Sequence, residues 1–280
     1  MNRHTFFFII LFISGTVCSQ KISCSPENRK AVESKIDKIQ DIPKDVPGET
    51  LIAIGKTFVG TPYVAKTLET GSEESVVIEL EGLDCTTFVE NVLAFGLIKQ
   101  DQNSDFDDFV KALEKIRYRG GNLNGYASRL HYFTEWITDN EDKGLITDIT
   151  ESLGGNNTPK ALHFMTEHRS LYPALEEENT FQEMVIVENS LPDHPYCVLS
   201  VETLKENEDM LRSGDIVALA TSIEGLDVTH TGFAIRMPND RIHLLHASTS
   251  GAVKISDLPL VDYLKKINKN TGVIVARPIF

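Results

Sequence analysis

Apolar side chains recur at helical spacing through the first hundred residues. In residues 26–42 they fall on one face of a charged segment, and residues 49–58 repeat the pattern. Pro43 and the pair Pro47-Gly48 lie between these segments and predict the end of the first helix. An apolar run at Val76–Leu80 predicts a short strand that leads into a polar turn. The first part of the chain is therefore predicted to be mainly helical.

The middle of the chain, about residues 101–205, has a different character. Residues 105–118 and 126–138 show helical spacing and are separated by a flexible Gly-Gly link. Residues 143–165 combine short strand-like runs with further Gly-Gly turns. Residues 167–179 predict a polar helix whose three consecutive glutamates face solvent. We therefore expect this region to be a large and mostly helical insert.

The last third of the chain has apolar runs rich in β-branched residues, which are typical of strands. A turn at Pro238-Asn239-Asp240 predicts a hairpin between the second and third of them. The predicted strands are Ile216–Ala220, Thr231–Arg236, Ile242–Ala247, Ala252–Ile255 and Val273–Arg277. Helices followed by an antiparallel sheet predict an α+β fold.

The composition is that of an ordinary globular protein, because 41% of the 280 residues are hydrophobic and 24% are charged. The formal net charge of −14 argues against a nucleic-acid partner, since no basic surplus is available to neutralise phosphates. The chain shows no internal repeat, and nothing in it indicates a protein partner.

Residues 1–19 have the pattern of a signal peptide. A short positive segment, Asn2–His4, precedes the apolar run Thr5–Phe12, and Val17-Cys18-Ser19 fits a cleavage site. The apolar run is too short to span a bilayer and no later segment resembles a membrane helix, so no stable membrane insertion is expected. A lipid anchor on Cys18 ranks second, because Val17 is bulkier than lipoprotein processing usually tolerates.

Signal removal leaves three cysteines, Cys24, Cys85 and Cys197. In an oxidising compartment an odd number is typical of one disulfide and one free thiol. Cys24–Cys197 is the expected pair if Cys85 is catalytic. The alternative of three reduced cysteines stays open, because spacing alone does not decide a pairing.

Cys85 lies where a polar turn meets a helical pattern. Asp84 is a good N-cap, so Cys85 is predicted to be the first helical residue. At that position the helix N-terminus and its free N–H groups favour the thiolate, which is the nucleophilic form. The alternative is a buried structural cysteine.

Two histidines follow on the predicted hairpin. His230 opens one strand and His246 lies on its partner, so the turn brings them side by side. A nucleophile needs a base, and the base needs a third group that orients it; Cys85, His230 and His246 fill these roles. A strand-end histidine packed in the core is the alternative for His230. His243 lies an odd number of residues from His246, so it faces the other way and is expected to be structural.

These residues lie in blocks that resemble a known family. The blocks are Gly60–Tyr63, Gly82–Val89, Gly214–Val217, His230–Phe233 and Leu245–Gly251. Their order resembles that of the NlpC-type bacterial cell-wall cysteine peptidases, which belong to a papain-like superfamily. The resemblance implies a papain-like NlpC-type fold with an antiparallel sheet or half-barrel. It also implies that Cys85 is the nucleophile, His230 the base, His246 the orienting residue and Tyr63 an active-site tyrosine.

A closer resemblance involves Arg117–Gly121, Gly125–Tyr132, Trp136 and Thr221–His230. These segments resemble the N-acetylmuramoyl-L-alanine amidase-like branch of the superfamily. That branch implies a cysteine hydrolase that cleaves the amide between N-acetylmuramic acid and L-alanine in peptidoglycan fragments (muropeptides), through a thioester. The alternatives are an endopeptidase that cuts the γ-D-Glu–diamino acid bond, a wall-binding module, and an acyltransferase.

The resemblance implies one catalytic domain over residues 20–280, and the signal peptide implies export to the periplasm. Its parts are residues 20–100 with the nucleophile, the insert at about 101–205, and the β part at 206–280. The acidic composition and the lack of a wall-binding repeat favour soluble muropeptides as substrate.

The insert supplies the candidate substrate-binding residues Tyr126, Ser128, Arg129 and His131, clustered at the start of a predicted helix. Arg129 is suited to bidentate capture of a substrate carboxylate, and pairing with an acidic residue of this acidic chain is the alternative. No zinc-type spacing of His and Cys is present, so neither a metal nor another cofactor is expected.

Overall fold

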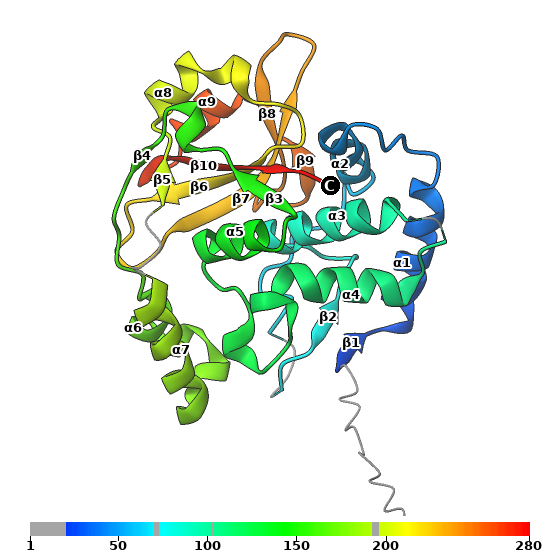
Figure 1. Ribbon diagram of the computed structural model, residues 1–280, viewed down its shortest axis with the longest axis vertical. Coiled ribbons are helices and arrows are strands. Elements are labelled where there is room, and N and C mark those ends of the chain that lie inside the picture. The colour runs from blue at the N-terminus through cyan, green and yellow to red at the C-terminus, as the bar shows by residue number, and fades with distance from the viewer. Residues whose placement is uncertain (1–20, 70–72, 102, 192–195) are drawn as a thin grey trace, which may run out of the picture.

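The computed structural model describes residues 21–69, 73–101, 103–191 and 196–280 (Figure 1). The predicted signal peptide and Cys18 lie outside these residues. The α+β prediction is confirmed, because helices from the first half pack against an antiparallel sheet formed mainly by the last third.

The first half of the chain is helical, as predicted. Its helices are α1 (Pro26–Ile39), α2 (Pro47–Lys56), α3 (Cys85–Lys99), α4 (Phe106–Arg117) and α5 (Phe133–Asp142). Ser25 caps α1, and Pro47 occupies the first turn of α2, where a missing N–H costs nothing. Pro47-Gly48 therefore opens the second helix, whereas the sequence was interpreted as ending the first one there.

Six strands form the main sheet, in the order β3-β10-β6-β7-β8-β9 with antiparallel neighbours. They are β3 (Ile146–Asp148), β6 (Ile216–Thr221), β7 (Val228–Arg236), β8 (Ile242–Ala247), β9 (Val253–Ile255) and β10 (Asn270–Pro278). All five predicted C-terminal strands are present. The insert contributes β3 to the edge of this sheet, so it is continuous with the rest of the fold.

Two small ladders accompany the main sheet. One joins β1 (Ile22–Cys24) to β2 (Val76–Ile78), and the other joins β4 (Asn156–Asn157) to β5 (Cys197–Val198). The remaining helices are α6 (Phe164–Glu167), α7 (Glu178–Ser190), α8 (Val201–Glu206) and α9 (Leu260–Leu264). Short 3-10 turns connect them.

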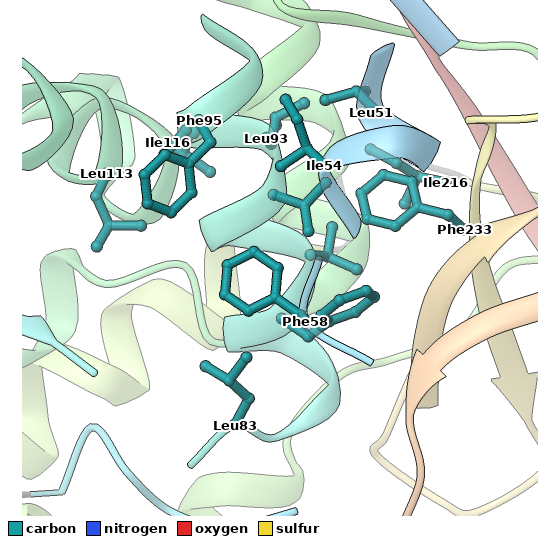
Figure 2. Close-up of a cluster of buried hydrophobic side chains, with 14 of the residues drawn as sticks. Leu51, Ile54, Phe58, Leu83, Leu93, Phe95, Leu113, Ile116, Ile216 and Phe233 are labelled. Atoms are coloured by element: carbon teal, nitrogen blue, oxygen red, sulfur yellow. The ribbon is translucent and has the colours of Figure 1, made fainter. Parts of the chain in front are cut away.

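Hydrophobic side chains cover both faces of the main sheet. On one face, Phe233 and Ile216 pack with Ile54, Phe58 and residues of α3, as Figure 2 shows. On the other face, Leu219, Leu244 and Val275 pack with α8 and α9. A sheet buried on both sides is a rigid base for side chains at its strand ends.

Two helix predictions in the insert were wrong. Residues 126–138 split into a 3-10 turn at Tyr126–Ser128, an extended stretch, and α5, which begins only at Phe133. The helix predicted at 167–179 is a series of short turns, and the long helix is α7. Glu177 caps α7 by accepting a hydrogen bond from the Thr180 amide at 2.6 Å, so the glutamate run lies at the start of a helix and not near the end of one.

Cys24, Cys85 and Cys197 are all free thiols. Cys24 ends β1 and Cys197 begins β5, and the two strands belong to different ladders. The Cys24–Cys197 disulfide is therefore not formed, and the reduced alternative holds in this structure. Over the ranges that the structure describes, no helix is long and apolar enough to cross a membrane.

Candidate active site

Cys85 is the first residue of α3, as the sequence predicted. Asp84 and Thr87 form a capping box in which the Thr87 amide donates to Asp84 Oδ1 at 2.8 Å and the Asp84 amide donates to Thr87 Oγ1 at 3.0 Å. The preceding residue, Leu83, donates its amide to Pro62 O at 3.0 Å. The cap and this bridge hold Cys85 beside the Pro62–Tyr63 turn.

The protonation of Cys85 differs from the prediction. Hydrogen bonds from the Thr231 amide and from Thr86 lower the pKa of the thiol, as a helix N-terminus should. Burial and the neighbouring Asp84 carboxylate outweigh them and raise the pKa to about 11. The resting group is therefore the thiol, and it needs a base to become a nucleophile.

His230 and His246, the predicted base and orienting residue, lie on adjacent strands and contact each other. His230 lies on β7 and His246 on the adjacent β8, with His230 Nε2 and His246 Nδ1 2.5 Å apart. Their ring centroids are 4.8 Å apart and the planes are nearly perpendicular. Gly232 permits this approach, because a Cβ there would lie 2.8 Å from His246 Cβ. The Thr231 amide that contacts Cys85 follows His230 directly, so the thiol lies beside this pair.

Both imidazoles are neutral at neutral pH. Burial lowers the pKa of His230 to about 4. Burial, His230 and Lys254 lower the pKa of His246 to about 3, and Asp257 opposes them. A neutral imidazole keeps one nitrogen free to accept a proton, which a base requires.

Two tyrosines lie within electrostatic reach of Cys85. Burial, Cys85 and Asp84 raise the pKa of the predicted Tyr63, and burial and Cys85 raise that of Tyr263. Tyr263 on α9 packs its ring edge-on against His246, with centroids 5.5 Å apart. The sequence analysis missed Tyr263. No local motif marks it, because only the packing of α9 on the sheet brings it to the site.

Three of the four insert residues, Tyr126, Arg129 and His131, contact one another, whereas Ser128 bonds to its own turn. Arg129 is buried, its Nη2 lies 2.5 Å from Glu69 Oε1, and its guanidinium lies 4.7 Å from the Tyr126 ring centroid. His131 Nε2 lies 2.9 Å from Tyr126 O, and Ser128 Oγ donates to Gly125 O at 2.7 Å. The ion-pair alternative for Arg129 is thus the one seen. Substrate binding by these four residues stays a prediction.

His243 and the cavity near α2 lie apart from the His230–His246 pair. His243 faces away from His246 and its Nδ1 lies 2.7 Å from Ser256 O, as expected for a structural residue. Within the described ranges, no group of three His, Cys, Asp or Glu side chains is arranged to hold a metal ion. A cavity of about 580 Å³ lies at the other end of the strands, between the start of α2 and residues such as Arg212 and Arg277.

Comparison with known proteins connects this geometry to a family. Residues 53–273 match the model of the AmiA-like, N-acetylmuramoyl-L-alanine amidase-like family. A structure named N-acetylmuramoyl-L-alanine amidase, from Bacteroides uniformis, is 35% identical with a TM-score of 0.79, over 84% of this chain and 99% of that one. No curated protein matches.

Two further structures are similar. A Bacteroides fragilis protein named "putative xylanase" is 37% identical with a TM-score of 0.75, over 80% of this chain and 98% of its own. A Legionella pneumophila protein is 20% identical with a TM-score of 0.68, over 91% and 96% of the two chains, and it shows the fold alone.

Proposed function

The chain belongs to the AmiA-like, N-acetylmuramoyl-L-alanine amidase-like family, and from this premise we propose that it hydrolyses the amide between N-acetylmuramic acid and L-alanine in muropeptides, with Cys85 as nucleophile. The observation that carries the cysteine mechanism is the neutral His230–His246 pair beside a protonated Cys85. It supplies the three roles of a cysteine hydrolase on two rigid strands and one helix N-terminus. The placement in the NlpC-type, papain-like superfamily is part of the same proposal.

The first half of the reaction forms a thioester. His230 donates its Nε2–H to His246 Nδ1, which leaves His230 Nδ1 to take the Cys85 proton. The thiolate attacks the lactyl carbonyl, and the Cys85 amide with the Tyr63 hydroxyl stabilises the oxyanion. Protonated His230 then gives its proton to the departing L-alanine nitrogen, the C–N bond breaks, and the peptide leaves.

The second half restores the enzyme. Neutral His230 accepts a proton from water as that water attacks the thioester carbonyl. The C–S bond breaks, the muramic acid carboxylic acid is released, and Cys85 leaves as the thiolate, which takes the proton back from His230. The steps consume one water and use only groups of the protein. Export to the periplasm, where muropeptides arise, belongs to this proposal.

The test is mass spectrometry of a purified disaccharide-tetrapeptide after incubation with wild type and with Cys85→Ala. Free disaccharide and intact tetrapeptide from wild type alone are expected. A disaccharide-dipeptide product would instead identify the γ-D-Glu endopeptidase. Equal amide cleavage by Cys85→Ala would reject the nucleophile.

Because one similar structure carries the name xylanase, release of reducing sugar from xylan is measured in parallel. A glycosidase requires two carboxyl groups that flank the scissile bond. Asp84, the carboxylate next to Cys85, is engaged in the helix cap. No release of reducing sugar is expected.

A further inference from the structure

The strand that carries His230 has a bulge directly before it. In the pairing of β6 with β7, Leu219 lies opposite His230 while the next residue, Ala220, lies opposite Val228. Thr229 is therefore an extra residue in β7. Val228 packs with the helix-side core and Ala234 with the opposite core, although regular alternation would place them on one face. From His230 onward the register is regular, so the bulge moves Val228 to the other face and marks the point where the regular strand that carries His230 begins.

The Asp227 side chain fixes the backbone at this bulge. It is only 2% exposed, and its Oδ1 accepts a hydrogen bond from the Val228 amide at 2.7 Å. Its backbone oxygen accepts from the Thr221 amide at 3.1 Å, which closes the loop between β6 and β7. Through these two hydrogen bonds Asp227 contacts both the end of β6 and the start of β7, the strand that carries His230.

The same carboxylate caps a helix of the insert. Asp227 Oδ2 accepts from the Thr134 amide at 2.8 Å and from Thr134 Oγ1 at 2.9 Å. Thr134 is the second residue of α5, and Tyr132 at the N-cap position makes no side-chain cap of its own. A negative charge is favourable at a helix N-terminus, so α5 depends on a residue from the β7 entry for its cap.

A second insert segment holds the rest of this loop. The amides of His163 and Phe164 donate to Gly225 O at 3.0 and 3.1 Å, and Lys160 Nζ donates to Thr221 O at 2.6 Å. Gly225 has a φ of +72°, and a Cβ there would lie 2.9 Å from Phe164 N, so this contact requires glycine. The insert therefore forms hydrogen bonds to the loop from Thr221 to Val228 at three residues, Thr221, Gly225 and Asp227.

From these contacts we propose that Asp227 is a positioning residue through which the insert sets the orientation of His230. Its two carboxylate oxygens make different contacts: Oδ2 accepts from Thr134 at the start of α5, and Oδ1 accepts from the Val228 amide at the bulge. Burial of this carboxylate is costly unless its hydrogen bonds are satisfied, and three donors to the side chain satisfy them. The reaction that depends on His230 is the proposed amide hydrolysis, so this inference rests on that function.

The first variant to test is Asp227→Asn, which keeps the side-chain shape. The amide retains one acceptor oxygen and turns an N–H₂ group toward a donor, so either α5 or the bulge loses its contact. We expect kcat to fall about 10- to 100-fold with KM little changed, because a shift of about 1 Å at a catalytic group costs that much. Thr134→Val removes one of the two donors to Oδ2, and we expect a decrease in kcat of about 3-fold.

A matched control is Glu188→Gln. Glu188 is equally buried and accepts hydrogen bonds from Tyr132 Oη at 2.6 Å and from the Met165 amide at 3.1 Å. These contacts lie inside the insert and do not include the β7 entry. Glu188→Gln is therefore expected to lower the melting temperature as Asp227→Asn does, while kcat stays within about 2-fold of wild type.

A second readout needs no substrate. The rate at which iodoacetamide alkylates Cys85 is followed by peptide mapping across a pH series, for wild type, Asp227→Asn, Thr134→Val, Glu188→Gln and His230→Ala. Wild type and Glu188→Gln are expected to react alike at neutral pH. His230→Ala is expected to react slowest, Asp227→Asn more slowly than wild type, and Thr134→Val at a rate between those of Asp227→Asn and wild type.

The outcomes separate this inference from the proposed function. Alkylation that depends on His230 and Asp227, without hydrolysis of any muropeptide, would reject the function and support the positioning role. A folded Asp227→Asn with wild-type kcat and wild-type alkylation would overturn the positioning role. So would an equal loss in Glu188→Gln, because the effect would then be a general loosening of the insert. If Asp227→Asn does not fold, wild-type alkylation of Thr134→Val overturns it.

Discussion

The pair Arg117–Glu90 and the imidazole pair His230–His246 both place ionisable groups in contact, but only the first joins a base to an acid. Burial raises the pKa of Glu90, and Arg117 opposes that shift. Arg117 Nε lies 2.7 Å from Glu90 Oε2, both side chains are 2% exposed, and Arg117 Nη1 also donates to Val77 O at 2.8 Å. In the imidazole pair, burial lowers both pKa values, and His230 and then Lys254 lower that of His246 further.

The difference follows from what each pair does. Arg117 and Glu90 join α4 to α3, and opposite charges with a backbone contact make that junction specific. The proposed reaction needs a general base that is unprotonated in the resting enzyme, so that it can accept the Cys85 proton. Two imidazoles that burial keeps neutral meet that requirement, and a carboxylate in place of His246 would raise the pKa of the proposed base.

The largest expected effect comes from His230→Ala, which removes the base. The thiol of Cys85 would have no acceptor for its proton, so kcat should fall by about 10³-fold. His230 is half-buried and carries no charge at neutral pH, so the melting temperature should change little. Steady-state kinetics and thermal unfolding check this. Activity within 10-fold of wild type would show that another group is the base.

Arg117→Ala tests the charged pair. Glu90 would be left buried and unpaired, which should cost about 3–5 kcal/mol of unfolding free energy. Denaturant unfolding measures it, and the folded fraction should retain its kcat. Arg119→Ala is the control, because its pair with Glu135 is partly exposed and should be worth less than about 1 kcal/mol. Equal losses in both variants would contradict the comparison.

His246→Asn keeps a hydrogen-bond partner for His230 but shortens its reach. The base remains and its orientation suffers, so kcat should fall about 10- to 100-fold, less than in His230→Ala. Initial rates at saturating substrate measure the decrease. A loss as large as that of His230→Ala would assign His246 a direct part in proton transfer.

The pH dependence should follow the neutral pair. For activity, the acid limb of kcat/KM is expected near pH 4, below the ordinary histidine range, because the base is protonated only there. For stability, both folded pKa values lie below the unfolded value, so the unfolded chain binds more protons in this window. Unfolding free energy should therefore decrease as pH falls from about 6.5 to about 4. His230→Gln should flatten that decrease, and an acid limb near pH 6.5 would contradict the neutral pair.

The smallest expected effect is that of a chelator. Every proposed step uses Cys85, His230, His246 or Tyr63, so incubation with EDTA should leave kcat unchanged. A loss of activity that zinc restores would replace the cysteine mechanism with a metal-dependent one.

Parts of the fold and of the candidate site could be predicted from local sequence patterns. The Asp84 cap, the start of α3 at Cys85 and the five C-terminal strands follow from short-range rules, since each depends on neighbours within a few residues. The predicted hairpin turn put His230 and His246 on adjacent strands, and the structure has their ring nitrogens 2.5 Å apart. Within the insert, the helix predicted at 105–118 is present as α4, but α5 and α7 were predicted poorly. The N-terminal cap of α5 comes from Asp227, far along the chain, and α7 follows turns that have no clear periodicity.

The sequence by itself determined the α+β fold class and the amidase-like family, because periodicity, caps and motif order are local properties; the three groups of the proposed reaction stay a prediction. Only the tertiary structure decided the protonation of Cys85, since burial outweighs the helix terminus that favours its thiolate. It also decided that Arg129 pairs with Glu69, that Tyr263 packs against His246, and that Asp227 joins α5 to the start of β7. These depend on desolvation and on contacts between distant segments, and both arise only when the chain is packed.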